Sequence, residues 1–221
     1  MEFFQCIEGR RSYRAFLEKD VDRAVLEKVM GAANRSPSYR NSQPWEVFIV
    51  AGEKRDRLAE RLTRAAISGE TPSSALPTPK EWPGALSKRM EEHTLLRLRA
   101  IGIDPDDEGK VRESGLRNYR FYDAPCAIFV GMHGPLAYWS VYDLGSFVHG
   151  ILLSLEAQGL GGCPQASVTR YGNIIKEELS IPEEIEIIIA ISVGYPDPDA
   201  PVNAYKSKRR EEAEFVRWYG L

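Results

Sequence analysis

The sequence predicts a single globular domain, residues 1–221, built from both helices and strands. Its 221 residues are 43% hydrophobic and 28% charged, proportions typical of an ordinary globular protein. A chain of this length buries roughly 70% of the surface that its unfolded form exposes, which is enough for one substantial core. Short apolar runs of strand length stand between longer segments with helical periodicity.

The first part of the chain predicts a helix, a loop, a strand and a second helix. Apolar residues within 26–33 recur at helical spacing after Asp22, a typical N-cap residue. Turn-forming residues fill positions 36–44, a junction well placed to meet a ligand. The apolar run Val47–Val50 then predicts a buried strand, and helical patterning returns over residues 53–67.

The middle of the chain predicts an irregular excursion between helices. Four prolines between residues 69 and 83 break every regular period. Helical patterning resumes over 84–100, and a further helix starts within 104–108 and runs toward residue 118. A stretch this rich in proline and charge is either a linker or a mobile lid over a site.

A strand and a long helix follow. The run 126–130 predicts a buried strand, and residues 139–158 form a helix that is apolar on nearly every side. Asp143, His149 and Glu156 interrupt it, so it is not a membrane span. Such a helix must be buried, either in the core of one subunit or at the centre of a dimer.

The last third predicts one more helix, a central strand and a tail. Gly159–Gly162 closes the long helix, and Thr169 is a possible N-cap for a helix that ends near Leu179. The run 185–193 is rich in Ile and Val and predicts a central strand. A polar, proline-bearing tail occupies residues 195–221.

Composition excludes several classes of function. The net charge of -3 argues against a surface that neutralises many phosphates, so we expect no nucleic-acid partner. Three separated cysteines fit neither a disulfide framework nor a metal knuckle, and the three histidines lack partners at metal-ligand spacing. No secretory signal or membrane span is evident, and we expect a cytoplasmic protein.

Two basic clusters stand out in this acidic chain. They comprise Arg10, Arg11 and Arg14 near one end, and Lys206, Lys208, Arg209 and Arg210 near the other. Arg10, Ser12 and Arg14 share a side of an extended segment, and in a helix the two arginines still share a face. Guanidinium forks with a hydroxyl suit a phosphate monoester, although an isolated basic run is more often a solvated surface.

The sequence shows neither a glycine-rich phosphate cradle nor an evident reactive side chain. There is no P-loop motif, and Gly159–Gly162 has neither the glycine spacing nor the preceding strand of a dinucleotide-binding loop. No nucleophile elbow occurs. We therefore expect no catalytic residue as such and a reaction carried by a cofactor.

Five motifs, in order, resemble the FMN-dependent nitroreductase family. They are Arg10–Phe16 (RRSYRAF), Ser36–Trp45 (SPSYRNSQPW), Asn118–Pro125 (NYRFYDAP), Gly159–Ala166 (GLGGCPQA) and Gly194–Pro196 (GYP), followed by the basic tail. Each motif alone is weak, but together they nearly span the chain. The resemblance implies an α+β fold with a central mixed or antiparallel sheet surrounded by helices, in an intertwined homodimer with FMN at the interface.

The resemblance also implies roles for individual residues. Arg10, Arg11, Ser12 and Arg14 would hold the phosphate and ribityl chain, joined by Arg209 and by Lys206, or by Lys208 in its place. Pro37, Ser38 and Asn41 would reach the flavin of the partner subunit. The segment Pro164–Ala166 (Pro164, Gln165 and Ala166) would lie along the flavin near its N5 atom. Backbone N–H donors there can stabilise the negative charge of the reduced ring.

The activity implied is a ping-pong reaction. NADH or NADPH reduces tightly bound, non-covalent FMN and leaves, and a nitroaromatic or quinone-like acceptor then enters the same space. Residues 68–122 would be the variable lid that shapes the acceptor pocket with Trp82, Phe121 and Tyr122, unless those aromatic side chains simply pack in the core.

Three other interpretations of the function are compatible with part of this sequence pattern. Flavin-dependent reductive dehalogenases of the same fold clamp an amino acid with a Glu, Tyr and Lys of the lid, a trio not evident between Ile67 and Tyr122. Flavin-destroying dimethylbenzimidazole synthases carry apolar residues where this chain has Asn41 and Ser42. A protein that binds flavin without turnover would use the same binding residues.

Overall fold

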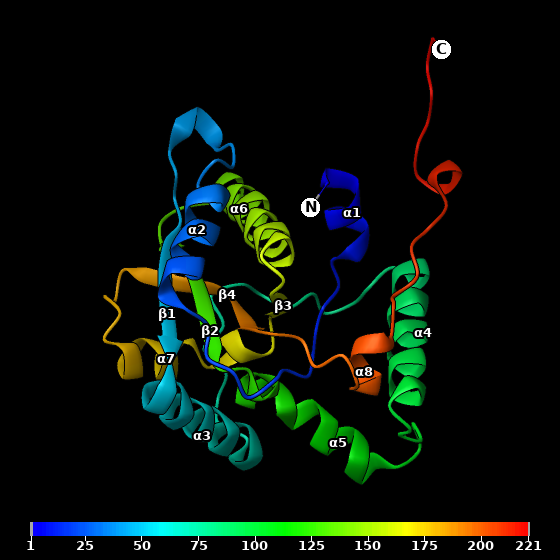
Figure 1. Ribbon diagram of the computed structural model, residues 1–221, viewed down its shortest axis with the longest axis horizontal. Helices are drawn as coiled ribbons and strands as arrows, with labels where there is room; N and C mark the ends of the chain where they lie inside the picture. Colours follow the sequence, from blue (N-terminus) through cyan, green and yellow to red (C-terminus); the bar gives the residue numbers. More distant parts are fainter. Residues whose placement is uncertain (1, 221) are drawn as a thin grey trace.

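Four antiparallel strands form the sheet that organises the chain (Figure 1). They are β1 (Glu46–Ala51), β2 (Cys126–His133), β3 (Gly161–Gln165) and β4 (Ile185–Gly194), in the spatial order β1-β2-β4-β3 in the computed structural model, which describes residues 2–220. β2 and β4 occupy the centre of the sheet; β2 is buried except at His133, and β4 is buried throughout its second half, residues 190–194. The predicted central strand is confirmed, and so is the α+β class.

Helices cover both faces of the sheet. α2 (Arg23–Ala33) and α6 (Tyr138–Ala157) pack on one face, against side chains such as Ile128 and Ile191. α3 (Gly52–Ser68), α7 (Gly172–Leu179) and the 3₁₀ segment Arg117–Asp123 pack on the other, against side chains such as Phe129. The alternation of side chains along β2 therefore feeds two separate apolar cores.

The remaining helices lie at one end of the sheet. α1 (Phe3–Gly9) lies beside α6, while α4 (Gly84–Ala100) stands against the short α8 (Pro201–Ala204), with α5 (Glu108–Leu116) below them (Figure 1). The tail then passes α4 and runs away from the body of the molecule (Figure 1). Within residues 2–220 no helix is both long and apolar enough to cross a bilayer.

Several sequence expectations need correction. β1 was expected to be buried, but it is an edge strand in which Val50 is buried and Ile49 is 43% exposed. Thr169 is not an N-cap: its hydroxyl donates to the Ala166 carbonyl inside a 3₁₀ turn, and α7 begins three residues later. Neither α1 nor β3 was predicted, because α1 is only seven residues long and β3 contains two glycines and a proline.

The long helix α6 is buried along one side only in the single chain. Leu144, Ile151 and Leu155 are almost fully enclosed. At its N-terminal end, by contrast, Trp139 is 67% and Tyr142 69% exposed. Complete burial in the core of one subunit is therefore wrong for this helix, whereas burial at the centre of a dimer stays a prediction. A large aromatic surface remains on its outer side.

Candidate functional site

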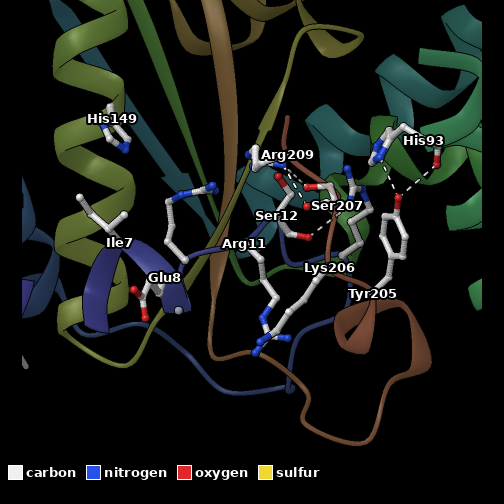
Figure 2. Close-up of a pocket in the computed structure, with 13 residues that line it drawn as sticks. Ile7, Glu8, Arg11, Ser12, His93, His149, Tyr205, Lys206, Ser207 and Arg209 are labelled. Atoms are coloured by element: carbon white, nitrogen blue, oxygen red, sulfur yellow. Dashed lines mark hydrogen bonds between the residues drawn. The ribbon is translucent and has the colours of Figure 1, made fainter. Parts of the chain in front are cut away.

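A cavity of about 450 Å³ lies where the two ends of the chain meet. It is lined by the end of α1, the segment that follows it, His93 of α4, His149 of α6 and the tail after α8 (Figure 2). Five cationic side chains contribute to its wall, namely Arg10, Arg11, Arg14, Lys206 and Arg209. Among the residues that line the cavity, Glu8 is the one carboxylate, so the cavity carries a large excess of positive charge.

Backbone pairing places the arginines of the N-terminal segment. Ser12 forms a parallel bridge with Gly162 of β3, and Phe16 an antiparallel bridge with Pro196. The segment is therefore extended, which is the arrangement that brings alternate side chains to one side. Tyr13 points the other way and packs against Gly161, where a Cβ atom would lie 2.6 Å from its ring. Gly161 thus permits the arginine segment to lie directly on β3.

Internal hydrogen bonds hold the cationic groups in place. The Arg11 Nη1 donates to the Asn203 carbonyl at 3.1 Å, and the Arg14 Nη1 to the Ser12 carbonyl at 3.2 Å. The Arg209 Nη1 donates to the Ser207 Oγ at 2.7 Å (Figure 2). Each guanidinium keeps further N–H groups that can meet an anion, because it carries five donors and these bonds use one nitrogen in Arg14 and Arg209 and two in Arg11, whose Nε also donates to the Tyr13 hydroxyl.

His93 extends this site onto α4. Its Nδ1 is hydrogen-bonded to the Tyr205 hydroxyl at 3.0 Å (Figure 2). Burial, together with the positive charges of Arg14, Arg97 and Arg209, lowers the pKa of His93 below its ordinary value. The imidazole is therefore neutral near pH 7, and an anion in the cavity would favour its protonated form.

The donor set fits a phosphate monoester better than other small ligands. Four guanidinium groups and the Lys206 ammonium line the cavity with the hydroxyl-bearing residues Ser12, Tyr205 and Ser207, and such sets recognise tetrahedral dianions. No glycine-rich loop contributes. Five of the seven cationic residues in the two basic clusters of the sequence thus line one cavity.

Comparisons with known proteins decide the family. The family model described as "Nitroreductase family" matches residues 7–195. The chain belongs to the nitroreductase family. It is 30% identical over 223 aligned residues to the 4-nitrobenzoate reductase of Pseudomonas putida, covering all of this chain and 96% of that protein.

Solved nitroreductase structures superpose closely on this chain. The crystal structure of the FMN-dependent nitroreductase NfnB from Mycobacterium smegmatis in complex with NADPH has a TM-score of 0.93 at 30% identity, covering 98% of this chain and 97% of that one. The FMN and NADPH-dependent NfnB of sphigopyxis sp. strain HMH has a TM-score of 0.95 at 26% identity over the full length of both chains. The predicted nitroreductase fold is therefore confirmed.

The structure brings together only part of the predicted flavin site. Six residues line the cavity: Arg10, Arg11, Ser12, Arg14, Lys206 and Arg209. Of the two alternatives in the tail, Lys206 lines the cavity, whereas Lys208 does not line it and is paired with Glu92 at 2.8 Å.

The loop with Pro37, Ser38 and Asn41 lies at the far side of α2 and α6 and does not line the cavity in this chain (Figure 1). It is fixed there because the Tyr39 backbone N–H donates to the buried Asp143 carboxylate at 3.0 Å. Its predicted contact with flavin therefore requires a second subunit.

The β3 residues lie beside the cavity rather than in its wall. Pro164 and Gln165 end the strand and Ala166 follows it. The Gln165 side chain is buried, donates to the Asn118 carbonyl at 2.8 Å and accepts from the Ser192 hydroxyl. The Gln165 side chain is thus engaged within the protein, and the contact of residues 164–166 with flavin stays a prediction.

The three predicted acceptor-pocket aromatics have different surroundings. Phe121 is fully buried and stacks edge-on against Phe129, so its assignment to a pocket is corrected to core packing. Tyr122 is 7% exposed, and its hydroxyl donates to the Asn118 Oδ1 at 2.8 Å. Trp82 is 44% exposed in the irregular stretch before α4.

Sequence reasoning missed several cavity residues. His93, Tyr205 and Ser207 line the wall. Asn203 does not line it, but its Oδ1 accepts a hydrogen bond from the backbone N–H of Arg14, which does. None of them lies in a motif, and His93 sits more than a hundred residues from Tyr205. The one local signal was the proximity of Tyr205 and Ser207 to the basic tail residues.

Proposed function

We propose that this nitroreductase is an FMN-dependent NAD(P)H oxidoreductase that reduces nitroaromatic or quinone-like acceptors. The main structural observation in support of this proposal is the cationic cavity where the two ends of the chain meet. Family relatives with full-length similarity reduce 4-nitrobenzoate or work with FMN and NADPH, according to their names. When bound, FMN would supply the hydride and electron transfer of a ping-pong reaction, with NADH or NADPH as donor.

The residues of this chain would bind and orient the cofactor. Arg10, Arg14, Lys206 and Arg209 would hold the phosphate with the Ser12 hydroxyl, and the Pro164–Ala166 backbone would meet the ring. Arg11 would lie behind the groups that contact the phosphate, because its Nη1 donates a hydrogen bond to the Asn203 carbonyl. These contacts position the flavin and surround it with positive charge, with no acid or nucleophile required of the protein.

The active unit would be a homodimer. The aromatic surface on the outer side of α6 continues onto the loop, where Tyr39 stacks on Trp139 with ring centroids 6.1 Å apart. Exposed aromatic patches of this kind mark association surfaces. A second copy would cover this patch and bring Pro37, Ser38 and Asn41 to the partner's flavin, which explains why these residues lie far from the cavity of their own chain.

Residues 68–122 would form the lid over the acceptor. α4 carries His93 to the cavity edge, and the irregular stretch before α4 holds Trp82 in an exposed position. The lid would bring this ring to the acceptor, and an aromatic face suits a planar molecule. The unit would be a single domain, with the tail from residue 195 completing the flavin site, in a cytoplasmic setting.

Purification and mutation test the proposal together. The purified protein should be yellow, or become so with FMN, and should oxidise NADH or NADPH steadily when a nitroarene is present. Arg10→Ala combined with Arg209→Ala should give a folded dimer without flavin, by loss of two charge-assisted contacts. Protein that stays colourless with FMN would refute the proposal, and bound FMN without turnover would indicate a flavin-binding protein instead.

A further inference from the structure

Asn203 is a buried polar residue at the joint between the two ends of the chain. It lies in α8 with 5% of its surface exposed. Its Oδ1 accepts the Arg14 backbone N–H at 2.8 Å, and its Nδ2 donates to the carbonyls of Ala15 and Asp197 at 2.8 and 2.9 Å. Its own carbonyl accepts the Arg11 guanidinium at 3.1 Å. One side chain and its backbone thus meet four separate partners.

These partners fix how the amide is oriented. One end faces an N–H donor and the other faces two carbonyl oxygens, so the oxygen and nitrogen cannot exchange places without losing all three bonds. The Arg14 carbonyl is held in turn by Arg117 Nη2 at 3.3 Å. The peptide on either side of Arg14 is therefore tied down by side chains from two distant parts of the chain.

The cavity has two halves, and Asn203 joins them. The arginines of the N-terminal segment form one half, while Lys206 and Arg209, three and six residues after Asn203, form the other. We infer that Asn203 is a positioning residue that sets these two halves against each other at the spacing needed for the flavin phosphate. This inference rests on the proposed function for the identity of the anion.

Removal of the amide should loosen this spacing. In Asn203→Ala the Arg14 N–H and two carbonyl groups lose their partner in a buried place, which favours a shifted backbone. Recognition of a phosphate by several cationic groups depends on their mutual geometry more than on their number. Under the proposed function the flavin ring would instead meet the Pro164–Ala166 backbone, so its binding should depend less on this spacing.

Comparison of FMN with riboflavin isolates the phosphate contribution, because riboflavin lacks the phosphate. We expect Asn203→Ala to weaken FMN binding by about tenfold or more and riboflavin binding by less than about threefold, measured by flavin fluorescence titration. Asn173→Ala is the matched control, since this exposed asparagine also makes side-chain and backbone hydrogen bonds but lies away from the cavity. It should change neither affinity.

A second readout does not use flavin. Inorganic phosphate should raise the melting temperature of the flavin-free wild-type protein, because a ligand of the folded state stabilises it, and should raise that of the variant less. If Asn203→Ala does not fold, Asn203→Ser replaces it, with the same expected selectivity. Equal losses for FMN and riboflavin, or an unchanged FMN affinity, would overturn the inference.

The two proposals fail in different ways. A protein that binds FMN with the predicted selectivity but never oxidises NADH or NADPH would refute the proposed function and leave the positioning role of Asn203 standing. A wild-type protein stabilised by neither FMN nor phosphate would overturn both.

Discussion

A methyl group added at Gly161 should displace the segment that carries the proposed flavin-binding arginines. Gly161 opens β3 directly beneath the arginine segment. A Cβ atom there would lie 2.6 Å from the Tyr13 Cδ2 and 2.7 Å from the Pro196 Cγ. Neither group is the flexible end of a long side chain, and Tyr13 is 8% exposed. Gly161→Ala must therefore push Tyr13 and the segment that carries it away from the sheet.

The size of the effect follows from the cost of overpacking. Insertion of a methyl group into a well-packed site costs about 1–3 kcal/mol. A protein of this size loses about 2–4 °C of melting temperature per kcal/mol. We expect flavin-free Gly161→Ala to melt about 2–12 °C below the wild type at equal protein concentration. FMN affinity should fall on the order of tenfold, because Ser12 and Arg14 flank the displaced Tyr13.

Thermal melting and FMN titration, compared with a control variant, test this reasoning. Gly31→Ala on α2 is the control, since no described atom beyond its own helix would lie within 4 Å of the added Cβ. Alanine is favoured over glycine inside a helix by about 0.5–1 kcal/mol, so this variant should melt at or above the wild-type temperature. A Gly161→Ala protein that melts and binds FMN like the wild type would refute the claim that β3 supports the arginine segment.

Three further predictions concern individual side chains. Lys206→Ala should weaken FMN binding about tenfold or more, while Lys208→Ala, at a residue that does not line the cavity, should change it less than about twofold; equal effects in titration would contradict the assignment. The pKa of His93 is lowered, mainly by burial, so the stability that its neutral form contributes is present above about pH 6.5 and lost as the pH falls below it. His93→Gln should therefore flatten the fall in melting temperature of the flavin-free protein between about pH 7 and about pH 5, and an unchanged slope would contradict this. Phe121→Ala should cost about 3–5 kcal/mol of unfolding free energy as a core cavity, whereas Trp82→Ala should cost less than about 0.5 kcal/mol and alter the KM for the acceptor; urea unfolding and steady-state kinetics separate the two.

The regular elements were predictable where the hydrophobic pattern was strong. The helix at 84–100 coincides with α4, and the strand at 126–130 lies within β2. β3 was not predictable, because its Gly-Gly-Cys-Pro-Gln sequence has low strand propensity. It is a strand only because its neighbour β4 offers a backbone edge, which is a tertiary contact that no local window contains.

The residues proposed to bind flavin were predictable where they lie in motifs. The arginines and the basic tail stood out from an acidic chain, and the structure brings them to one cavity. His93 and Asn203 could not be found this way, since their roles depend on how α4 and α8 pack against the ends of the chain. Phe121, by contrast, lies within a motif but packs in the hydrophobic core.

The most direct test of the central claim follows the flavin through both half-reactions. The FMN-loaded protein is mixed without oxygen with NADPH or NADH, and the absorption band of oxidised flavin is recorded before and after addition of a nitroarene. The proposed function predicts rapid bleaching by at least one nicotinamide and recovery of the band with the nitroarene. Bound flavin that neither nicotinamide bleaches, or that the nitroarene does not reoxidise, would contradict it.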